Sequence, residues 1–147
     1  MTRINSAIPV HCLTDEHLLA EHREIKRLPY CLRRSLESSN NLVSRIPKEF
    51  VLGRGHVTFF LNKMQFTLKR YQQLHAECLR RNFKVIDYSD NWRSVELEYM
   101  KDYTPTSAER SLLVERITQR LTESPKSCWH FAGRPITTKY AIEMLST

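Results

Sequence analysis

Apolar residues recur at helical spacing in three stretches of the chain. The first stretch has apolar residues seven, three and four positions apart, which is the spacing of one helix face: Leu18, Ile25, Leu28 and Leu32. Thr14 and Asp15 are good N-cap residues and predict where this helix begins. Pro29 predicts a kink or an end near Leu28, and the Ser- and Asn-rich residues 35–41 predict a loop.

Two further helices are predicted downstream. The one after Asn62 has its apolar face at Met64, Leu68, Tyr71, His75 and Cys78. Its basic residues lie off that face, and we expect them at the surface: Lys69, Arg70, Arg80 and Arg81. The other begins at a capping box, Thr106 to Glu109, behind Pro105, and its apolar stripe is Leu113, Ile117 and Leu121.

The segments between these helices have no clear period. Residues 51–60 have the composition of a strand, a turn and a second strand, and the tail after Pro125 is expected to be irregular. No internal repeat and no long polar linker divides the 147 residues. We therefore predict an all-α fold: a single compact domain, residues 1–147, of three main helices with long irregular connections.

The charge of the chain suggests a polyanionic partner. There are 23 Lys and Arg against 16 Asp and Glu, which gives a net charge of +7. Such a surplus in a small protein favours nucleic acid as the partner, although a surface charged only for solubility has the same balance.

Cysteine usage and hydropathy indicate where the protein works. The four cysteines, Cys12, Cys31, Cys78 and Cys128, are scattered and form no C-x-x-C pair, so we expect reduced thiols. No apolar run approaches the roughly 18 residues that span a bilayer, and the N-terminus lacks the apolar segment of a signal peptide. We expect a soluble, cytoplasmic protein that makes no use of a membrane.

The N-terminus is the first candidate for chemistry. Thr2 is small enough for the initiator Met1 to be removed, which leaves a free α-amine on Thr2. An α-amine has a pKa of about 7.7–8, against about 10.4 for lysine, so part of it is neutral and nucleophilic at pH 7. It can form a Schiff base without special desolvation. Many inert proteins also begin with Met-Thr, so this feature alone does not identify a site.

The second candidate is the first predicted helix. His17, Glu21 and Glu24 fall on one face, with Arg23 and Arg27 in an adjacent basic row. A carboxylate beside arginines suits an acid–base group held against a phosphate backbone. The alternative is a solvated face with Glu–Arg pairs, in which a change of Glu21 to Gln is mild.

Histidines of the same region admit two further interpretations. A metal site could combine His17, Glu21 and Glu24 with His56, although no second clean pair of ligands is present. We expect His22 at the helix surface and His75 at the edge of the core.

Several segments resemble the pyrimidine-dimer DNA glycosylases of phages, also called phage endonuclease V. The resemblance is carried by MTRIN (1–5), DEHLLAEHRE (15–24), LGRGHVTFF (52–60), Lys63, AECLRR (76–81), Asp102-Tyr103 before Pro105, and Gly133-Arg134. It covers most of the chain, and its first and central motifs are specific.

The resemblance implies a mechanism and a set of site residues. Thr2, freed of Met1, matches the nucleophilic terminal residue, and Glu24 matches the catalytic carboxylate. The residues matching DNA contacts are Arg3, His17, Arg23 and Arg27. The family acts without a metal or other cofactor on double-stranded DNA that contains pyrimidine dimers or abasic sites, kinks the duplex and flips a base opposite the dimer.

The expected activity is therefore a DNA glycosylase combined with an abasic-site lyase, carried by a monomer. Two alternatives stay open: a glycosylase/lyase for other damaged or abasic sites, and a non-catalytic DNA-binding protein on the same fold. Thr2 and Glu24 distinguish the last of these, because a protein that only binds DNA needs neither.

Overall fold

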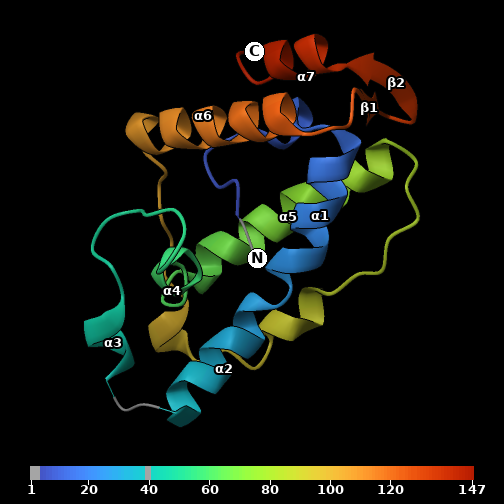
Figure 1. Ribbon diagram of the computed structural model, residues 1–147. Coiled ribbons are helices and arrows are strands. Elements are labelled where there is room, and N and C mark those ends of the chain that lie inside the picture. The colour runs from blue at the N-terminus through green and yellow to red at the C-terminus, as the bar shows by residue number, and fades with distance from the viewer. Residues whose placement is uncertain (1–3, 39–40) are drawn as a thin grey trace.

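The computed structural model describes residues 4–38 and 41–147 and is mostly helical, with one small two-stranded sheet (Figure 1). In chain order the elements are η1 (Val10–Cys12), α1 (Asp15–Ile25), α2 (Leu28–Ser38), α3 (Leu42–Arg45), α4 (His56–Phe59), α5 (Met64–Arg80), η2 (Ser89–Trp92), η3 (Leu97–Tyr99), α6 (Ser107–Glu123), β1 (Cys128–Phe131), β2 (Arg134–Thr137) and α7 (Thr138–Met144). The helical fold class is confirmed, and the three predicted helices are present as α1, α5 and α6.

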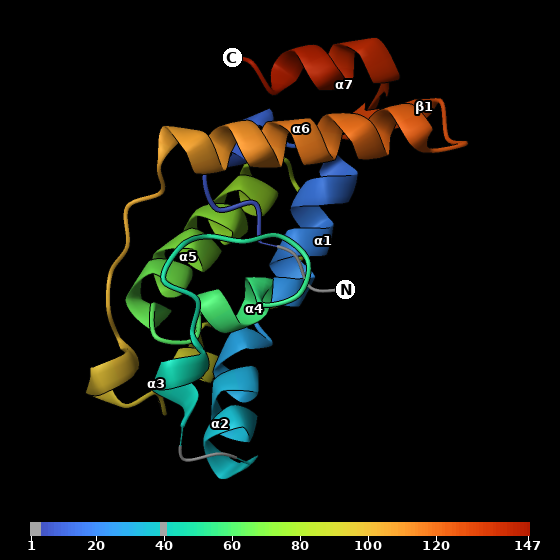
Figure 2. The same cartoon turned by 60° about the vertical axis from the view of Figure 1, so that its left-hand side comes forward.

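The helices stack in layers around one core. Helix α1 packs against α5, and in both ribbon views α6 runs across the top of this pair with α7 above it (Figures 1 and 2). One cluster of buried apolar side chains includes residues from Ile4 to Leu145. Both ends of the described chain thus contribute to the same core.

The predicted helix starts are confirmed by their caps. Thr14 accepts a hydrogen bond from the His17 amide at α1, and Thr106 accepts one from the Glu109 amide at α6. The Glu109 side chain does not complete the capping box; it bonds to Ser6 and Tyr103 instead.

The break predicted near Leu28 is confirmed, and Pro29 lies at the start of the next helix. Helix α1 ends at Ile25, and α2 begins at Leu28 with Pro29 in its first turn, where the missing proline N–H leaves no intrahelical bond unmade. Helix α2 continues to Ser38, so the predicted loop over 35–41 is wrong for residues 35–38. The helix persists because Leu32 and Leu36 pack on the core.

The strand–turn–strand expectation for residues 51–60 is wrong. This segment forms a loop and the short helix α4, whose N-cap Gly55 has φ of +91°. That backbone conformation suits glycine and does not continue a strand. Burial of Phe59 and Phe60 in the core fixes α4 in place.

The tail after Pro125 is ordered, not irregular. Strands β1 and β2 pair with Phe131 opposite Arg134, which leaves a two-residue turn at Ala132 and Gly133. Both turn residues have positive φ, +52° and +82°, as the common tight hairpin turn requires. Thr137 then caps α7 by accepting from the Tyr140 amide.

Two arginines that we expected at the surface are buried. Arg70 and Arg81 are 3% and 6% exposed, because each meets carboxylates inside the fold. Arg81 donates to Asp15 and Glu77, and Asp15 in turn accepts from the backbone amides of the hairpin turn. This network joins α1, α5 and the hairpin.

Candidate active site and nucleic-acid interface

Glu24 lies at the C-terminal end of α1 between two arginines. Its Oε2 accepts from Arg27 at 2.9 Å, and its Oε1 is 3.9 Å from Arg23 Nε. The Glu24 side chain is 25% exposed, and the arginine side chains are 57% and 67% exposed. The predicted carboxylate and basic row therefore lie together at the surface.

Glu21, one turn earlier, has a different environment. It is 2% exposed, and its two oxygens accept from Arg70 Nε and Nη2 at 2.8 and 3.0 Å. The solvated-face interpretation is therefore wrong for Glu21. The metal interpretation also fails, because both oxygens of Glu21 already accept hydrogen bonds from Arg70. No group of three or more candidate metal ligands is found within residues 4–38 and 41–147.

Buried side chains hold the segment that leads to the N-terminus. Their bonds, in chain order, are His56 Nε2 to the Ile4 amide at 2.9 Å, Glu21 to the Asn5 side-chain amide at 3.1 Å, Glu109 to the Ser6 hydroxyl, and Arg70 to the Ile8 carbonyl at 2.6 Å. We call residues 4–8 with these partners the N-terminal anchor. Sequence analysis missed it, because each bond joins residues far apart in the chain.

Thr2 and Arg3 lie outside the described residues. They are the predicted nucleophile and a predicted DNA contact, and the N-terminal anchor is the described segment that directly follows them in the chain.

His17 lies at the other end of α1 from Glu24, about 10 Å away along the helix axis. Its ring stacks on Trp129 of β1, with 5.8 Å between ring centroids, and its Nδ1 is 2.9 Å from Thr14 Oγ1. Burial lowers the pKa of His17 below its ordinary value, which favours a neutral ring. The structure thus places His17 under the hairpin and not beside Glu24.

His22 is buried, against our expectation of a surface position. It is 4% exposed, and its Nε2 is 3.0 Å from His75 Nδ1. Burial lowers the pKa of His22, and the neighbouring His75 lowers it further. The pair fills the interface between α1 and α5 with one shared hydrogen bond.

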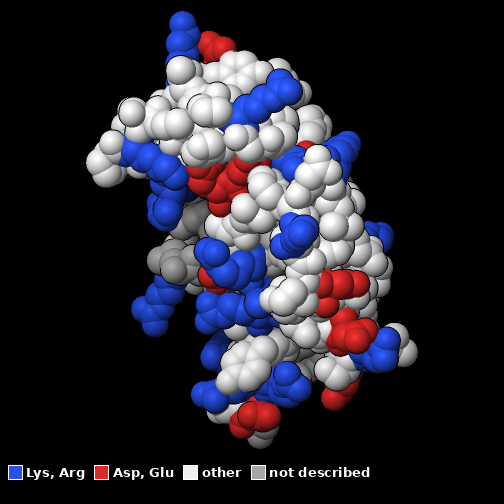
Figure 3. All heavy atoms as spheres, turned by 90° about the vertical axis from the view of Figure 1, so that its right-hand side faces the viewer, with Lys and Arg blue, Asp and Glu red and all other residues white. Residues whose placement is uncertain are grey.

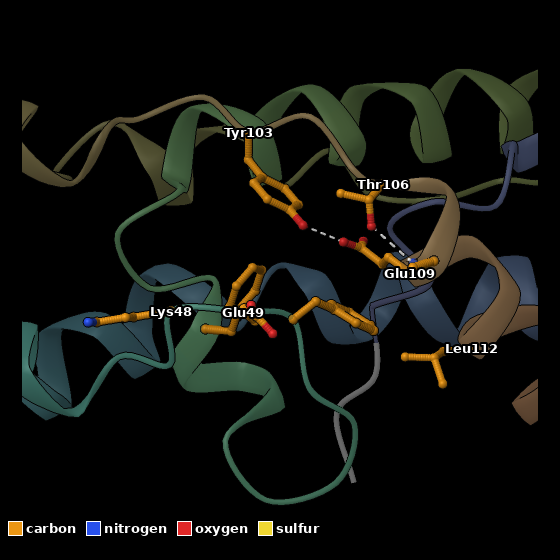
Figure 4. Close-up of a pocket in the computed structure, with 9 residues that line it drawn as sticks. Lys48, Glu49, Tyr103, Thr106, Glu109 and Leu112 are labelled. Atoms are coloured by element: carbon orange, nitrogen blue, oxygen red, sulfur yellow. Dashed lines mark hydrogen bonds between the residues drawn. The ribbon is translucent and has the colours of Figure 1, made fainter.

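A cavity of about 500 Å³ opens beside α6 and α4. Phe50, Phe59 and Tyr103 supply aromatic walls. In the close-up, Tyr103 and Thr106 both point toward Glu109, to which the Tyr103 hydroxyl donates (Figure 4). Burial and the Glu109 carboxylate raise the pKa of the Tyr103 phenol, so it stays a donor. Because Glu109 also holds Ser6, the cavity adjoins the N-terminal anchor.

Basic side chains gather on the face that carries α1 and α2. Figure 3 shows Lys and Arg grouped at the height of the lower part of α1 and of α2, with most acidic side chains above them or toward one edge. The exposed basic residues of α1, α2 and the link between them include Arg23, Arg27, Arg33 and Arg34. Tyr30 is 53% exposed on α2, and both Arg33 and Arg34 lie about 6 Å from its ring. This face offers cations and an aromatic surface to a polyanion.

The four cysteines are unpaired, as predicted. Burial raises the pKa of Cys78 to about 11, which keeps it an unreactive thiol.

In the part of the chain that the structure describes, no helix has the length and apolar character needed to cross a membrane.

A comparison with known families identifies the family of this chain. Residues 1–90, well over half of the chain, match the profile of the family described as pyrimidine dimer DNA glycosylase. The matched region includes α1, α2, α4 and α5, and the partners of the N-terminal anchor except Glu109. This chain belongs to the pyrimidine dimer DNA glycosylase family, whose members are DNA repair enzymes acting on the N-glycosyl bond of damaged DNA.

Proposed function

We propose that the protein is a bifunctional enzyme that cleaves the N-glycosidic bond of the 5′ pyrimidine in a cyclobutane pyrimidine dimer and then cuts the strand, with the Thr2 amine as its nucleophile. The amine attacks C1′ of the 5′ nucleotide, and the bond from C1′ to the base breaks. Opening of the sugar ring gives an imine between Thr2 and C1′. Loss of a C2′ proton then expels the 3′ phosphate by β-elimination, and water releases the amine.

The observation that carries this proposal is the position of the N-terminal anchor relative to Glu24. Asn5 is bonded to Glu21, and Glu24 follows Glu21 by three residues, about 4.5 Å along the helix. Thr2 lies three positions before Asn5, and three extended residues span up to about 10 Å. The Thr2 amine is therefore within reach of the Glu24 carboxylate.

Glu24 stabilises the positive charge that develops on the sugar and on the imine. It also accepts and returns protons during ring opening and elimination. Arg3, Arg23 and Arg27 bind phosphates around the lesion, whereas His17, stacked on Trp129 under the hairpin, is not part of this contact. These contacts stabilise a kinked duplex, which costs less to form at a poorly stacked lesion than in intact DNA.

The aromatic cavity beside α6 suits a base displaced from the duplex. Its rings can stack on the base, and Glu49 at its rim can accept from an exocyclic amine. 2-Aminopurine placed opposite the dimer should become more fluorescent on binding, and Phe50→Ala should reduce that gain. An unchanged signal in the variant would place the displaced base elsewhere.

Borohydride trapping tests the nucleophile. The protein should form a covalent adduct with dimer-containing DNA and with abasic-site DNA, and peptide mapping should find it on Thr2 with Met1 absent. The rival is Lys63, because burial lowers the pKa of its ammonium and makes the neutral amine more available. An adduct on Lys63, or trapping that survives N-terminal acetylation, would overturn the assignment.

Glu24→Gln tests the carboxylate. Dimer cleavage should fall by about 100- to 1,000-fold, while binding to dimer-containing DNA stays nearly unchanged. Cleavage near the wild-type rate would remove Glu24 from the mechanism. Two outcomes with the wild-type protein would favour the alternatives. Activity on abasic DNA without activity on dimers would favour a lyase for other lesions, and DNA binding without any trapping would favour a non-catalytic protein.

A further inference from the structure

The backbone two residues from Thr2 is fixed by a single imidazole. The Ile4 amide donates to His56 Nε2 at 2.9 Å, and the other ring nitrogen, Nδ1, is 2.9 Å from the Val51 carbonyl oxygen. His56 is 2% exposed. It therefore links the N-terminal anchor to the loop before α4 without competition from bulk water.

These two partners determine the protonation state of the ring. A backbone N–H can only donate, so Nε2 must carry a lone pair toward Ile4. A carbonyl oxygen can only accept, so Nδ1 must carry the proton toward Val51. The arrangement requires the neutral ring with its proton on Nδ1. A second proton would set two N–H groups of His56 and Ile4 against each other.

Aromatic packing fixes the orientation of the ring. Phe50 and Phe60 meet it edge to face, with ring centroids 5.5 and 5.4 Å from that of His56 and interplanar angles of 85° in both cases. Because the ring cannot turn away, the position of its Nε2 decides the position of the Ile4 amide.

We propose that His56 is a positioning residue that holds the Thr2 amine in attacking geometry through the Ile4 amide. This inference rests on the proposed function, because it needs Thr2 to be the nucleophile. Ile4 is the first described residue and lies two positions after Thr2, so a shift of the Ile4 backbone passes directly to the amine. Misplacement of a reacting group by about 1 Å can cost on the order of 100-fold in rate.

Two substitutions separate the bonds of His56. The amide of Gln reaches the position of Nε2, so His56→Gln keeps an acceptor for Ile4 and loses the bond to Val51. The shorter amide of Asn reaches the position of Nδ1, so His56→Asn keeps the Val51 bond and loses the Ile4 acceptor. Both remove the ring, so a purely structural role predicts similar losses of stability and of rate for the two.

Single-turnover trapping on abasic-site DNA, at saturating DNA and below the unfolding temperature of each variant, measures the amine alone. We expect His56→Asn to trap about 10- to 100-fold more slowly than His56→Gln. The pH at which the amine titrates should be unchanged, since only its position differs. His75→Gln is the matched control: it loses the group at the Nδ1 position, which bonds to His22, and should trap at the wild-type rate.

Semisynthesis provides a test that leaves His56 intact. Cys12 is a native ligation point, so a synthetic peptide of residues 2–11 can be joined to residues 12–147 with Thr2 free. Replacing the Ile4 amide by an ester removes only the donated N–H and should slow trapping as His56→Asn does. Equal trapping by the ester, the amide and both His56 variants would overturn the inference while leaving the function intact. Failure of the all-amide protein to trap on Thr2 would overturn the proposed function itself.

Discussion

Replacing Glu21 by Gln should destabilise the fold far more than the same change one turn later. The Glu21 and Arg70 side chains are 1% and 3% exposed and are joined by two hydrogen bonds of 2.8 and 3.0 Å. Glu21→Gln leaves the guanidinium of Arg70 buried without an anion. Removing one partner of a buried pair costs about 3–5 kcal/mol of unfolding free energy.

This loss converts into a measurable shift of the melting temperature. A domain of this size loses about 2–4 °C per kcal/mol, so Glu21→Gln should melt about 6–20 °C below the wild type. Glu24→Gln is the matched control, because its partners are exposed and such pairs contribute about 0.2–1 kcal/mol. The measurement is circular dichroism at neutral pH.

The Glu21 argument also predicts partial recovery. Arg70→Met in the Glu21→Gln background removes the unpaired charge and should regain part of the lost stability. Similar melting temperatures for Glu21→Gln and Glu24→Gln would refute the reasoning, because a buried unpaired guanidinium cannot cost as little as an exposed one.

Other predictions concern DNA binding and the hairpin. Arg27→Gln should lower the log–log salt slope of DNA binding by about 0.9 and weaken binding to dimer-containing DNA more than to undamaged duplex; equal losses in a salt titration would make Arg27 an ordinary phosphate contact. Partial burial raises the pKa of Glu16, but hydrogen bonds from His130 and Lys126 outweigh it, so its pKa lies below the ordinary 4.5. Its stabilisation of the hairpin is therefore present above pH 4.5 and lost as the pH falls through the lower folded value, which Trp129 fluorescence should report and Glu16→Gln should abolish. Gly133→Ala should lower the free energy of unfolding by roughly 1–2 kcal/mol, because φ is +82°. No atom lies within 4 Å of an added Cβ, so the loss comes from the backbone alone; no loss in thermal unfolding would mean that the turn relaxes.

The long helices could be predicted because their signals are local. Caps at Thr14 and Thr106 and apolar residues at helical spacing are visible within a few turns of sequence. Helix α4 and the hairpin could not be predicted in this way. Helix α4 depends on packing of Phe59 in the core, and the hairpin turn places Ala132, which is not a usual turn residue, at positive φ.

The burial of charged residues could not be predicted from the sequence either. Arg70 lies at a position that reads as surface by helical spacing, and only its pairing with Glu21, 49 residues away, makes burial tolerable. The same holds for Arg81 and Asp15, 66 residues apart. Sequence spacing identifies which face of a helix is polar, but it does not show which polar face another element will cover.

The candidate site likewise has one part that the sequence predicts and one part that it does not. Glu24, Arg23 and Arg27 share one helix end, so their proximity follows from helical geometry. The N-terminal anchor joins residues 52, 16, 103 and 62 positions apart, and no local pattern announces it. The proposed chemistry therefore rests on groups of two kinds. Loss of Glu24 should remove activity and leave stability, whereas loss of Glu21 should remove stability first and activity as a consequence. His56 lies between these cases, because its two hydrogen bonds serve the amine on one side and the fold on the other.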